Sequence, residues 1–131
     1  MHTRTTSDVL RRLLMADALI SGATGILMVS AAPALAGLFE LPVPLLRYAG
    51  LALLPFAVLV MYLSRSARLA PSGVRTVIAL NGAWVVASVV VLMTGWIAPN
   101  GLGVAFVVLQ AMAVAVLAEL QYIGLRRAAG C

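Results

Sequence analysis

The sequence predicts an all-α integral membrane protein, a bundle of four transmembrane helices. Three observations lead to this prediction: 63% of its 131 residues are hydrophobic, only 10% are charged, and the apolar residues fall into four long runs. Soluble domains are about half apolar and about a quarter charged, whereas a bilayer-spanning helix requires about 20 apolar residues. Four spans therefore use nearly the whole chain and leave no length for a separate aqueous domain.

The four apolar runs are separated by short segments rich in proline, glycine, serine and asparagine, which favour turns. A helix rises about 1.5 Å per residue, so a run of about 20 to 25 residues is long enough to cross a bilayer with some tilt. The first run could also be a signal peptide cleaved near Ala36, but its length and its Asp17 favour a retained helix. The expected spans of this single transmembrane domain are approximately residues 13–37, 44–64, 74–97 and 102–125.

The basic residues predict the orientation of the bundle. All nine are arginines, and eight of them flank the two termini or the loop between the second and third spans: Arg4, Arg11, Arg12, Arg65, Arg68, Arg75, Arg126 and Arg127. By the positive-inside rule, both termini and this middle loop lie in the cytoplasm. We therefore expect a multi-pass protein of a bacterial inner membrane.

The net charge of +5 could also suggest a nucleic-acid partner. Proteins that bind nucleic acid concentrate basic residues on one face. In this chain the arginines occur in ones and twos at the ends of apolar runs, so the expected partner is the lipid bilayer and not nucleic acid.

Polar residues inside the spans form the candidate functional site, because ionisable groups in a bilayer are energetically costly. Asp17, Asn81 and Glu119 lie about 7 to 10 Å inward of the flanking arginines, at similar depth on three spans. If the mildly polar stripes of the helices face inward, these groups converge on one pocket in the cytoplasmic half of the membrane. The candidate ligand-binding residues are Asp17, Ser21, Thr24, Tyr62, Asn81 and Glu119.

The two carboxylates also have a purely structural interpretation. Asp17 lies close to Arg12 in sequence and Glu119 lies seven residues from Arg126, so both could form ion pairs at the membrane edge. Polar side chains within spans also join helices through hydrogen bonds worth about 0.6 to 2 kcal/mol each. The sequence is consistent with both interpretations.

Small residues recur four positions apart on several spans. Ser21 and Gly25 do so on the first span, and Ala79, Ala83 and Ala87 do so on the third. Such patterns let helix backbones approach closely in a membrane. They predict close helix contacts, either within the bundle or between copies of the chain.

Several kinds of chemistry lack the residues they require. The spans contain no HExxH motif, no histidine pair and no Cys/His set, so we expect no metal, haem or other cofactor. No histidine lies within the spans to activate a serine, so we expect no catalytic residue of that kind. The single cysteine, Cys131, excludes an internal disulfide.

Four segments carry a resemblance to known proteins: Arg11–Ala18, Ser21–Gly25, Asn81–Trp84 and Ala118–Tyr122. In these segments, and over nearly its whole length, the chain resembles a widespread family of uncharacterised four-helix proteobacterial inner-membrane proteins. This likeness implies a fold and a location but no activity. In size and layout the chain is also similar to the DoxX-like proteins, which implies an accessory role beside membrane oxidoreductases or in assembly.

The leading functional hypothesis is an accessory, assembly or interaction subunit, and the sequence leaves open whether the chain is an enzyme. It would act through helix contacts, with a membrane protein or a second copy as partner, or through a bound apolar ligand. One alternative is a carrier or binding protein for a small amphipathic or proton-linked molecule in a pocket of Asp17, Asn81 and Glu119. The other is an intramembrane isomerase, in which a carboxyl pair moves a proton on a lipid-soluble substrate.

Overall fold

The computed structural model is all-helical over the residues it describes, which are 2–66 and 69–130. Side chains are described for residues 8–66 and 69–127. The helices are α1 (His2–Ser30), α2 (Ala32–Phe39), α3 (Val43–Arg65), α4 (Pro71–Thr94) and α5 (Gly101–Gly130). All except the short α2 are long and apolar enough to cross a membrane. The predicted fold class, an all-α membrane bundle of four spans, is confirmed.

The first predicted span is shorter than expected. The helix α1 ends at Ser30 instead of near residue 37, and the chain turns at Ala31 into α2. Pro33 stands in the first turn of α2, where its missing N–H costs nothing, whereas it could not continue α1 without losing a backbone hydrogen bond. The helix α2 ends at Phe39, and the residue that caps it, Glu40, adopts a left-handed conformation with φ 54°.

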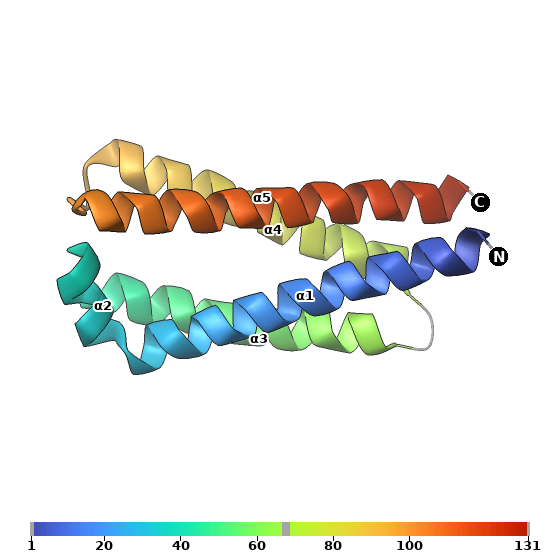
Figure 1. The fold of residues 1–131 in the computed structure, drawn as a ribbon, viewed down its shortest axis with the longest axis horizontal. Coiled ribbons are helices and arrows are strands. Elements are labelled where there is room, and N and C mark those ends of the chain that lie inside the picture. Colours follow the sequence, from blue (N-terminus) through green and yellow to red (C-terminus); the bar gives the residue numbers. More distant parts are fainter. Residues whose placement is uncertain (1, 67–68, 131) are drawn as a thin grey trace.

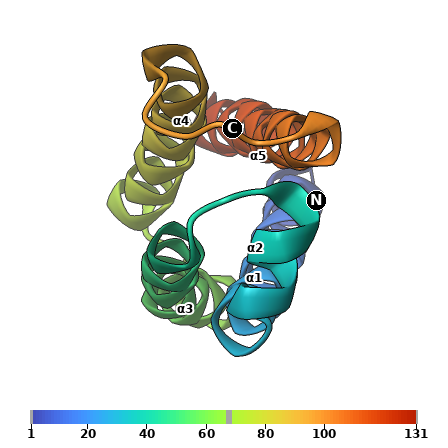
Figure 2. The same cartoon turned by 90° about the vertical axis from the view of Figure 1, so that its left-hand side faces the viewer.

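The four long helices lie side by side, and both termini are at the same end of the bundle (Figure 1). Seen from the other end, α1, α3, α4 and α5 occupy four corners around a common centre (Figure 2). The helix α1 packs most extensively against α3, α4 packs against α5, and α1 also contacts α5. By contrast, α3 and α4 have the least contact of these neighbouring pairs, although they follow one another in sequence. The bundle is therefore least closed between α3 and α4.

The helices α1 and α3 cross in close contact at Gly25 and Gly50. A Cβ atom on Gly50 would lie 2.8 Å from Val29 Cγ2 and 2.9 Å from the backbone oxygen of Gly25. Glycine is required at this position because the two backbones approach too closely for a larger side chain. The other small-residue pattern behaves differently, since Ala79, Ala83 and Ala87 of the third span are exposed and not buried in a helix contact.

At the end opposite to the termini, α2 and the α4–α5 turn lie against each other. The amide nitrogen of Asn100 donates to Phe39 O (3.2 Å), and its side-chain Nδ2 donates to Leu38 O (2.8 Å). Asn100 Oδ1 also accepts from Gly103 N (2.8 Å), which caps the start of α5. Phe39 and Phe106 stack with their ring centroids 4.7 Å apart. These contacts close this end of the bundle.

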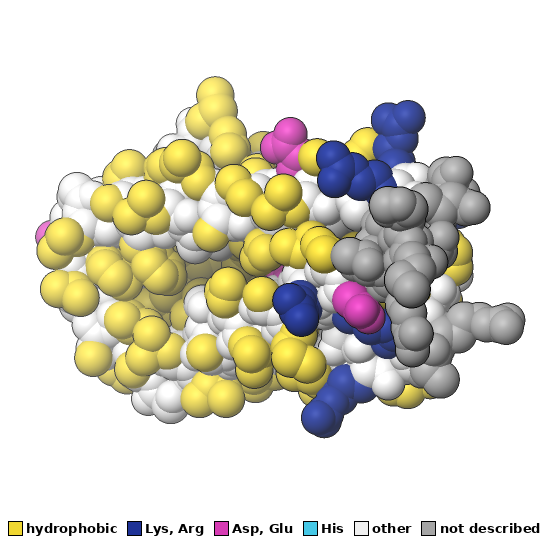
Figure 3. Space-filling view, turned by 45° about the vertical axis from the view of Figure 1, so that its right-hand side comes forward, with side chains coloured by type: hydrophobic (Ala, Val, Ile, Leu, Met, Phe, Trp, Pro, Cys, Tyr) yellow, Lys and Arg dark blue, Asp and Glu magenta, His cyan; other side chains and the backbone are white. Residues whose placement is uncertain are grey.

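The end that holds the termini is charged. Figure 3 shows the basic side chains gathered toward this end, while most of the remaining visible face is hydrophobic. Arg11 Nη1 donates to the backbone oxygens of Ser64 (3.0 Å) and Ser66, which ties α1 to the end of α3. A cation is favourable there because the last carbonyls of a helix carry partial negative charge. The side chains of Arg4, Arg68 and Cys131 lie outside the described residues.

Candidate functional site

The centre of the bundle contains a polar cluster made by three helices. Asp17 of α1, Asn81 of α4 and Gln121 of α5 have exposed fractions of 0%, 3% and 0%. Asn81 Nδ2 and Gln121 Nε2 each donate to Asp17 Oδ2 at 2.8 Å. Asn81 Nδ2 also donates to Gln121 Oε1 at 3.2 Å. The three side chains therefore form a closed triangle of hydrogen bonds around one carboxylate oxygen.

The second carboxylate oxygen has its own donor. Ser21 lies one helix turn after Asp17 and donates from Oγ to Asp17 Oδ1 at 3.2 Å. Within the described residues Asp17 forms no ion pair, and its hydrogen-bond donors are Ser21, Asn81 and Gln121. The ion pair expected between Asp17 and a neighbouring arginine is thus not formed within the described residues. Three uncharged donors hold this side chain instead.

Local sequence patterns place these polar groups on buried helix faces. On α4, Asn81 follows the buried Val74 and Val77 at spacings of seven and four residues, so all three share one face. On α5, Gln121 and the buried Leu125 are four residues apart. An apolar layer separates the cluster from the charged end; its buried members are Leu10, Leu14, Ala18, Val60, Leu63, Val74, Val77 and Leu125. The cluster is consequently shielded from water on that side.

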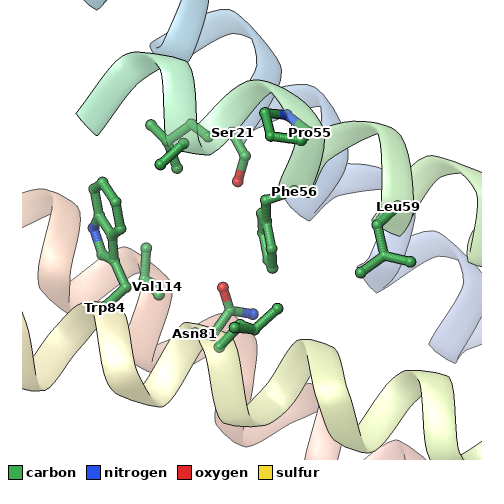
Figure 4. A pocket seen from close by; sticks show the side chains of 10 residues that line it. Ser21, Pro55, Phe56, Leu59, Asn81, Trp84 and Val114 are labelled. Carbon is green, nitrogen blue, oxygen red and sulfur yellow. The ribbon is translucent and has the colours of Figure 1, made fainter. Parts of the chain in front are cut away.

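A cavity of about 380 Å³ adjoins the cluster in the space between α3 and α4 (Figure 4). Its lining residues are Ser21, Ala52, Leu53, Pro55, Phe56, Leu59, Leu80, Asn81, Trp84 and Val114. Pro55, Leu59 and Leu80 are exposed at the outer surface, whereas Ser21 and Asn81 are buried. The cavity thus extends from the apolar outer surface of the bundle to a polar floor. Asp17 does not line it and lies behind Ser21 and Asn81.

A second cavity, of about 170 Å³, lies toward α2 and shares Trp84 with the first. Thr24, Phe106 and Gln110 are among its lining residues. Trp84 Nε1 donates to Gln110 Oε1 at 2.6 Å, and Gln110 Nε2 donates to Ser88 Oγ at 3.1 Å. The indole of Trp84 is therefore held between the two cavities by a hydrogen bond across α4 and α5.

The structure brings together only part of the predicted site. Asp17, Ser21 and Asn81 meet in the cluster, and Thr24 lines the second cavity. Tyr62 is 71% exposed and Glu119 is also exposed, so the expected convergence of these two residues with the others is corrected.

The rotation of each helix explains these two exclusions. Residues two positions apart on a helix point in nearly opposite directions, because each residue turns the helix by about 100°. Gln121 faces inward, so Glu119 faces outward. On α3, Val60 and Leu63 occupy the buried face, and Tyr62 falls on the other side.

Gln121 is the member of the cluster that sequence reasoning missed. The high cost of an ionisable group in a bilayer favoured Glu119 on this helix over the uncharged amide two residues later. A usable signal was its spacing from Gln110: eleven residues correspond to about three helix turns, so the two glutamines share one face. In the structure both of them do make hydrogen bonds to side chains of α4.

The arrangement supports binding more directly than it supports bond chemistry. The cluster contains one carboxylate, and no three His, Cys, Asp or Glu side chains among the described residues could hold a metal ion. What faces the cavity is an apolar wall with the polar atoms of Ser21 and Asn81 at its floor. Comparison of the chain with models of protein families, with curated proteins and with solved structures finds no match.

Proposed function

We propose that this protein binds a small, lipid-soluble, amphipathic molecule in the cavity between α3 and α4. The observation that carries this proposal is the cavity itself, which has a volume of about 380 Å³, mostly apolar walls and a polar floor. Ligand sites in proteins have volumes of about 300 to 1,000 Å³, with apolar walls and a few polar groups that fix orientation. The cavity has all of these properties.

The position of the cavity favours a ligand that arrives from the bilayer. Its mouth lies between the two neighbouring helices with the least mutual contact, and Pro55, Leu59 and Leu80 at the mouth belong to the lipid-facing surface. A lipid-soluble molecule could enter there without crossing water. Its polar group would then exchange the bilayer for hydrogen bonds with Ser21 and Asn81, which favours binding in this orientation.

Fluorescence quenching of Trp84 tests the proposal, because this side chain lines the cavity. The chain has two tryptophans, so Trp96→Phe leaves Trp84 as the sole emitter. In phosphatidylcholine nanodiscs, a dodecyl chain with a terminal bromine and a hydroxyl head should quench Trp84 with saturation. A non-specific quencher dissolved in the bilayer would give a response that rises without saturation.

A matched pair of variants locates the binding site. Ala52→Phe places a ring at the cavity wall and should abolish saturable quenching, since the ring occupies the space of the ligand. Ala83→Phe makes the same change at an exposed alanine of α4 that lines neither cavity, so it should leave quenching intact. Quenching that never saturates, or that survives Ala52→Phe as well as Ala83→Phe, would refute the proposal.

The site as the structure builds it differs from the one expected from sequence. Glu119 faces away from the cavity, so Asp17, Asn81 and Glu119 do not share one pocket. Instead, Ser21 and Asn81 form the polar floor of the cavity. The isomerase hypothesis required two carboxyl groups within reach of one substrate. Neither Asp17 nor Glu119 lines the cavity, and Glu119 is exposed on the outer face of α5, so we do not propose this activity.

A second function, interaction with a membrane partner, is favoured by the exposure of Glu119. This carboxylate lies among exposed apolar side chains of α5, such as Met112 and Val116. Within the described residues it forms no ion pair, and the guanidinium of Arg126 instead lies 5.7 Å from the ring centre of Tyr122. A charge facing lipid is costly, so a partner helix that offers a basic or amide group would stabilise it.

Native mass spectrometry from mild detergent tests this second proposal. A complex with a second copy or with another membrane protein should be recovered from the wild-type chain and weakened by Glu119→Leu. Asp17 is buried within the monomer, so Asp17→Asn should not change the stoichiometry except by unfolding, which circular dichroism would report. Identical masses for the wild-type chain and Glu119→Leu would contradict an interaction through this carboxylate.

We also propose that the protein resides in a bacterial inner membrane with both termini and the α3–α4 turn in the cytoplasm. The distribution of arginines supports this orientation, because Arg11, Arg65, Arg75 and Arg126 flank the end that holds the termini. We propose membership in the proteobacterial four-helix family on the basis of the segments that resemble it, and a relation to the DoxX-like proteins on the basis of size and layout.

A further inference from the structure

The polar atoms that the protein presents to the cavity are hydrogen-bond acceptors. Both N–H bonds of the Asn81 amide are engaged, since Nδ2 donates to Asp17 Oδ2 and to Gln121 Oε1. Its Oδ1 has no donor among the described residues, and it is not sealed from the cavity. Figure 4 shows this oxygen directed into the space between α3 and α4. Asn81 therefore offers the cavity an acceptor and no donor.

Ser21 behaves in the same way. Its hydroxyl has a single proton, which it donates to Asp17 Oδ1. Its oxygen retains lone pairs and points toward the cavity in Figure 4. Ser21 and Asn81, the two polar residues at the floor of the cavity, thus both offer an acceptor and no donor.

Asp17 determines this character without touching the cavity. A carboxylate only accepts hydrogen bonds, so the neighbouring amides must turn their N–H groups toward it. If the Asn81 amide rotated by 180°, Oδ1 would face Asp17 Oδ2 and Gln121 Oε1, and three acceptors would meet in a buried place. Such an arrangement leaves buried groups unsatisfied, which costs about 1 to 3 kcal/mol for each group. Asp17 is therefore a positioning residue for Asn81 and Ser21.

We infer that the ligand of this cavity is an uncharged lipophilic molecule whose polar end carries an O–H donor, such as a long-chain alcohol. This inference rests on the proposed binding function and specifies its ligand class. A molecule that only accepts hydrogen bonds, such as an ether, an ester or a ketone, finds no donor at the floor. A carboxylate is excluded more strongly, because the residues that line the cavity offer its charge neither a donor nor a cation.

Two probes of nearly the same shape test the inference in the wild-type protein. Dodecanol has the hydroxyl donor, and dodecyl methyl ether has the same chain and oxygen without it. Each is titrated as a competitor against the brominated probe in nanodiscs of the Trp96→Phe protein. One neutral hydrogen bond is worth about 0.5 to 1.5 kcal/mol, so dodecanol should bind about two- to tenfold more tightly than the ether. Dioleoylglycerol, added in a separate titration, shows whether a membrane lipid with a free hydroxyl also competes.

The possible results separate this inference from the proposed function. If none of the probes competes for a saturable site, the proposed function fails. If dodecanol and the ether compete equally well, the cavity binds apolar chains and the inference of a donor is wrong. Tighter binding of the ether would also overturn it, because the floor would then offer a donor.

A substitution of Asp17 provides a readout that a merely structural role would not change. In Asp17→Asn, the new amide can donate toward Asn81, whose own amide can then rotate and present an N–H to the cavity. The ratio of the affinity for dodecanol to the affinity for the ether should fall toward one, while both molecules still bind through their apolar chains. Glu119→Gln removes the other intramembrane carboxylate, which faces lipid, and should leave the preference unchanged. An unchanged preference in Asp17→Asn would refute the positioning role.

Discussion

Replacement of Asp17 by leucine is expected to destabilise the bundle more than any other single change in its polar side chains. The carboxylate accepts three hydrogen bonds, from Ser21 at 3.2 Å and from Asn81 and Gln121 at 2.8 Å each. Hydrogen bonds between side chains in membrane proteins contribute about 0.6 kcal/mol on average and up to about 1.7 kcal/mol. The loss of three such bonds predicts a decrease of about 2 to 5 kcal/mol in the free energy of unfolding.

The conservative variant Asp17→Asn should cost less. Its remaining oxygen can still accept from Ser21, while the two bonds to the former Oδ2 are lost and a rotated Asn81 amide recovers one of them at most, which predicts about 1 to 3 kcal/mol. Unfolding is measured by titration with dodecyl sulfate in mixed micelles, followed by circular dichroism. Glu119→Gln is the matched control, because this carboxylate is exposed and should change the unfolding free energy by no more than about 0.5 kcal/mol. The reasoning would be refuted if Glu119→Gln lowered the unfolding free energy as much as Asp17→Asn, or if Asp17→Leu did not lower it. Asp17 would then not hold the buried cluster together, or Glu119 would not be on the exposed face.

Two further predictions concern packing and orientation. Gly50→Ile should reduce the unfolding free energy by about 1 to 3 kcal/mol in the same titration, because a Cβ atom there would lie 2.8 Å from a side chain of α1. Gly82→Ala, with nothing within 4 Å, should be neutral or slightly stabilising, and an equal cost for both would contradict the α1–α3 crossing. The orientation is tested with a membrane-impermeant thiol reagent in a Cys131→Ser background. Ser72→Cys should react only after the cytoplasmic side is opened, whereas Glu40→Cys should react in intact cells. The reverse pattern would invert the proposed topology.

The bundle itself follows from the sequence because the bilayer restricts the possible structures so strongly. A chain with four long apolar runs must satisfy its backbone hydrogen bonds internally, and helices are the direct solution for runs of this length. The end of α1 was less predictable, since a proline within an apolar run can be tolerated in a membrane helix. In this chain Pro33 begins a new helix because α2 packs onto α3 and α5, a contact that no local pattern indicates.

The candidate site was predictable on α1 and α4 but not on α5. Asp17 is followed by Ser21 and Thr24 at helical spacing, which marks one face of α1 as polar, and Asn81 is the one strongly polar residue in the middle of α4. The span of α5 is apolar on all sides, so periodicity does not indicate which side faces inward. The choice between Glu119 and Gln121 therefore depended on the rotation of the helix, for which the shared face of Gln110 and Gln121 was the one sequence signal.

The polar cluster also explains how a bundle with an open side can hold together. The helices α1 and α4 lie diagonally opposite each other, without close backbone contact (Figure 2). The hydrogen bond from Asn81 to Asp17 spans this diagonal, and Gln121 joins α5 to both. Because α4 is tied through the centre to α1 and along its side to α5, it does not need extensive contact with α3. The same three side chains thus permit the gap between α3 and α4 and set the hydrogen-bonding character of the cavity within it. A substitution that weakens the cluster should for this reason change stability and ligand preference together, whereas a change at the cavity mouth should affect binding alone.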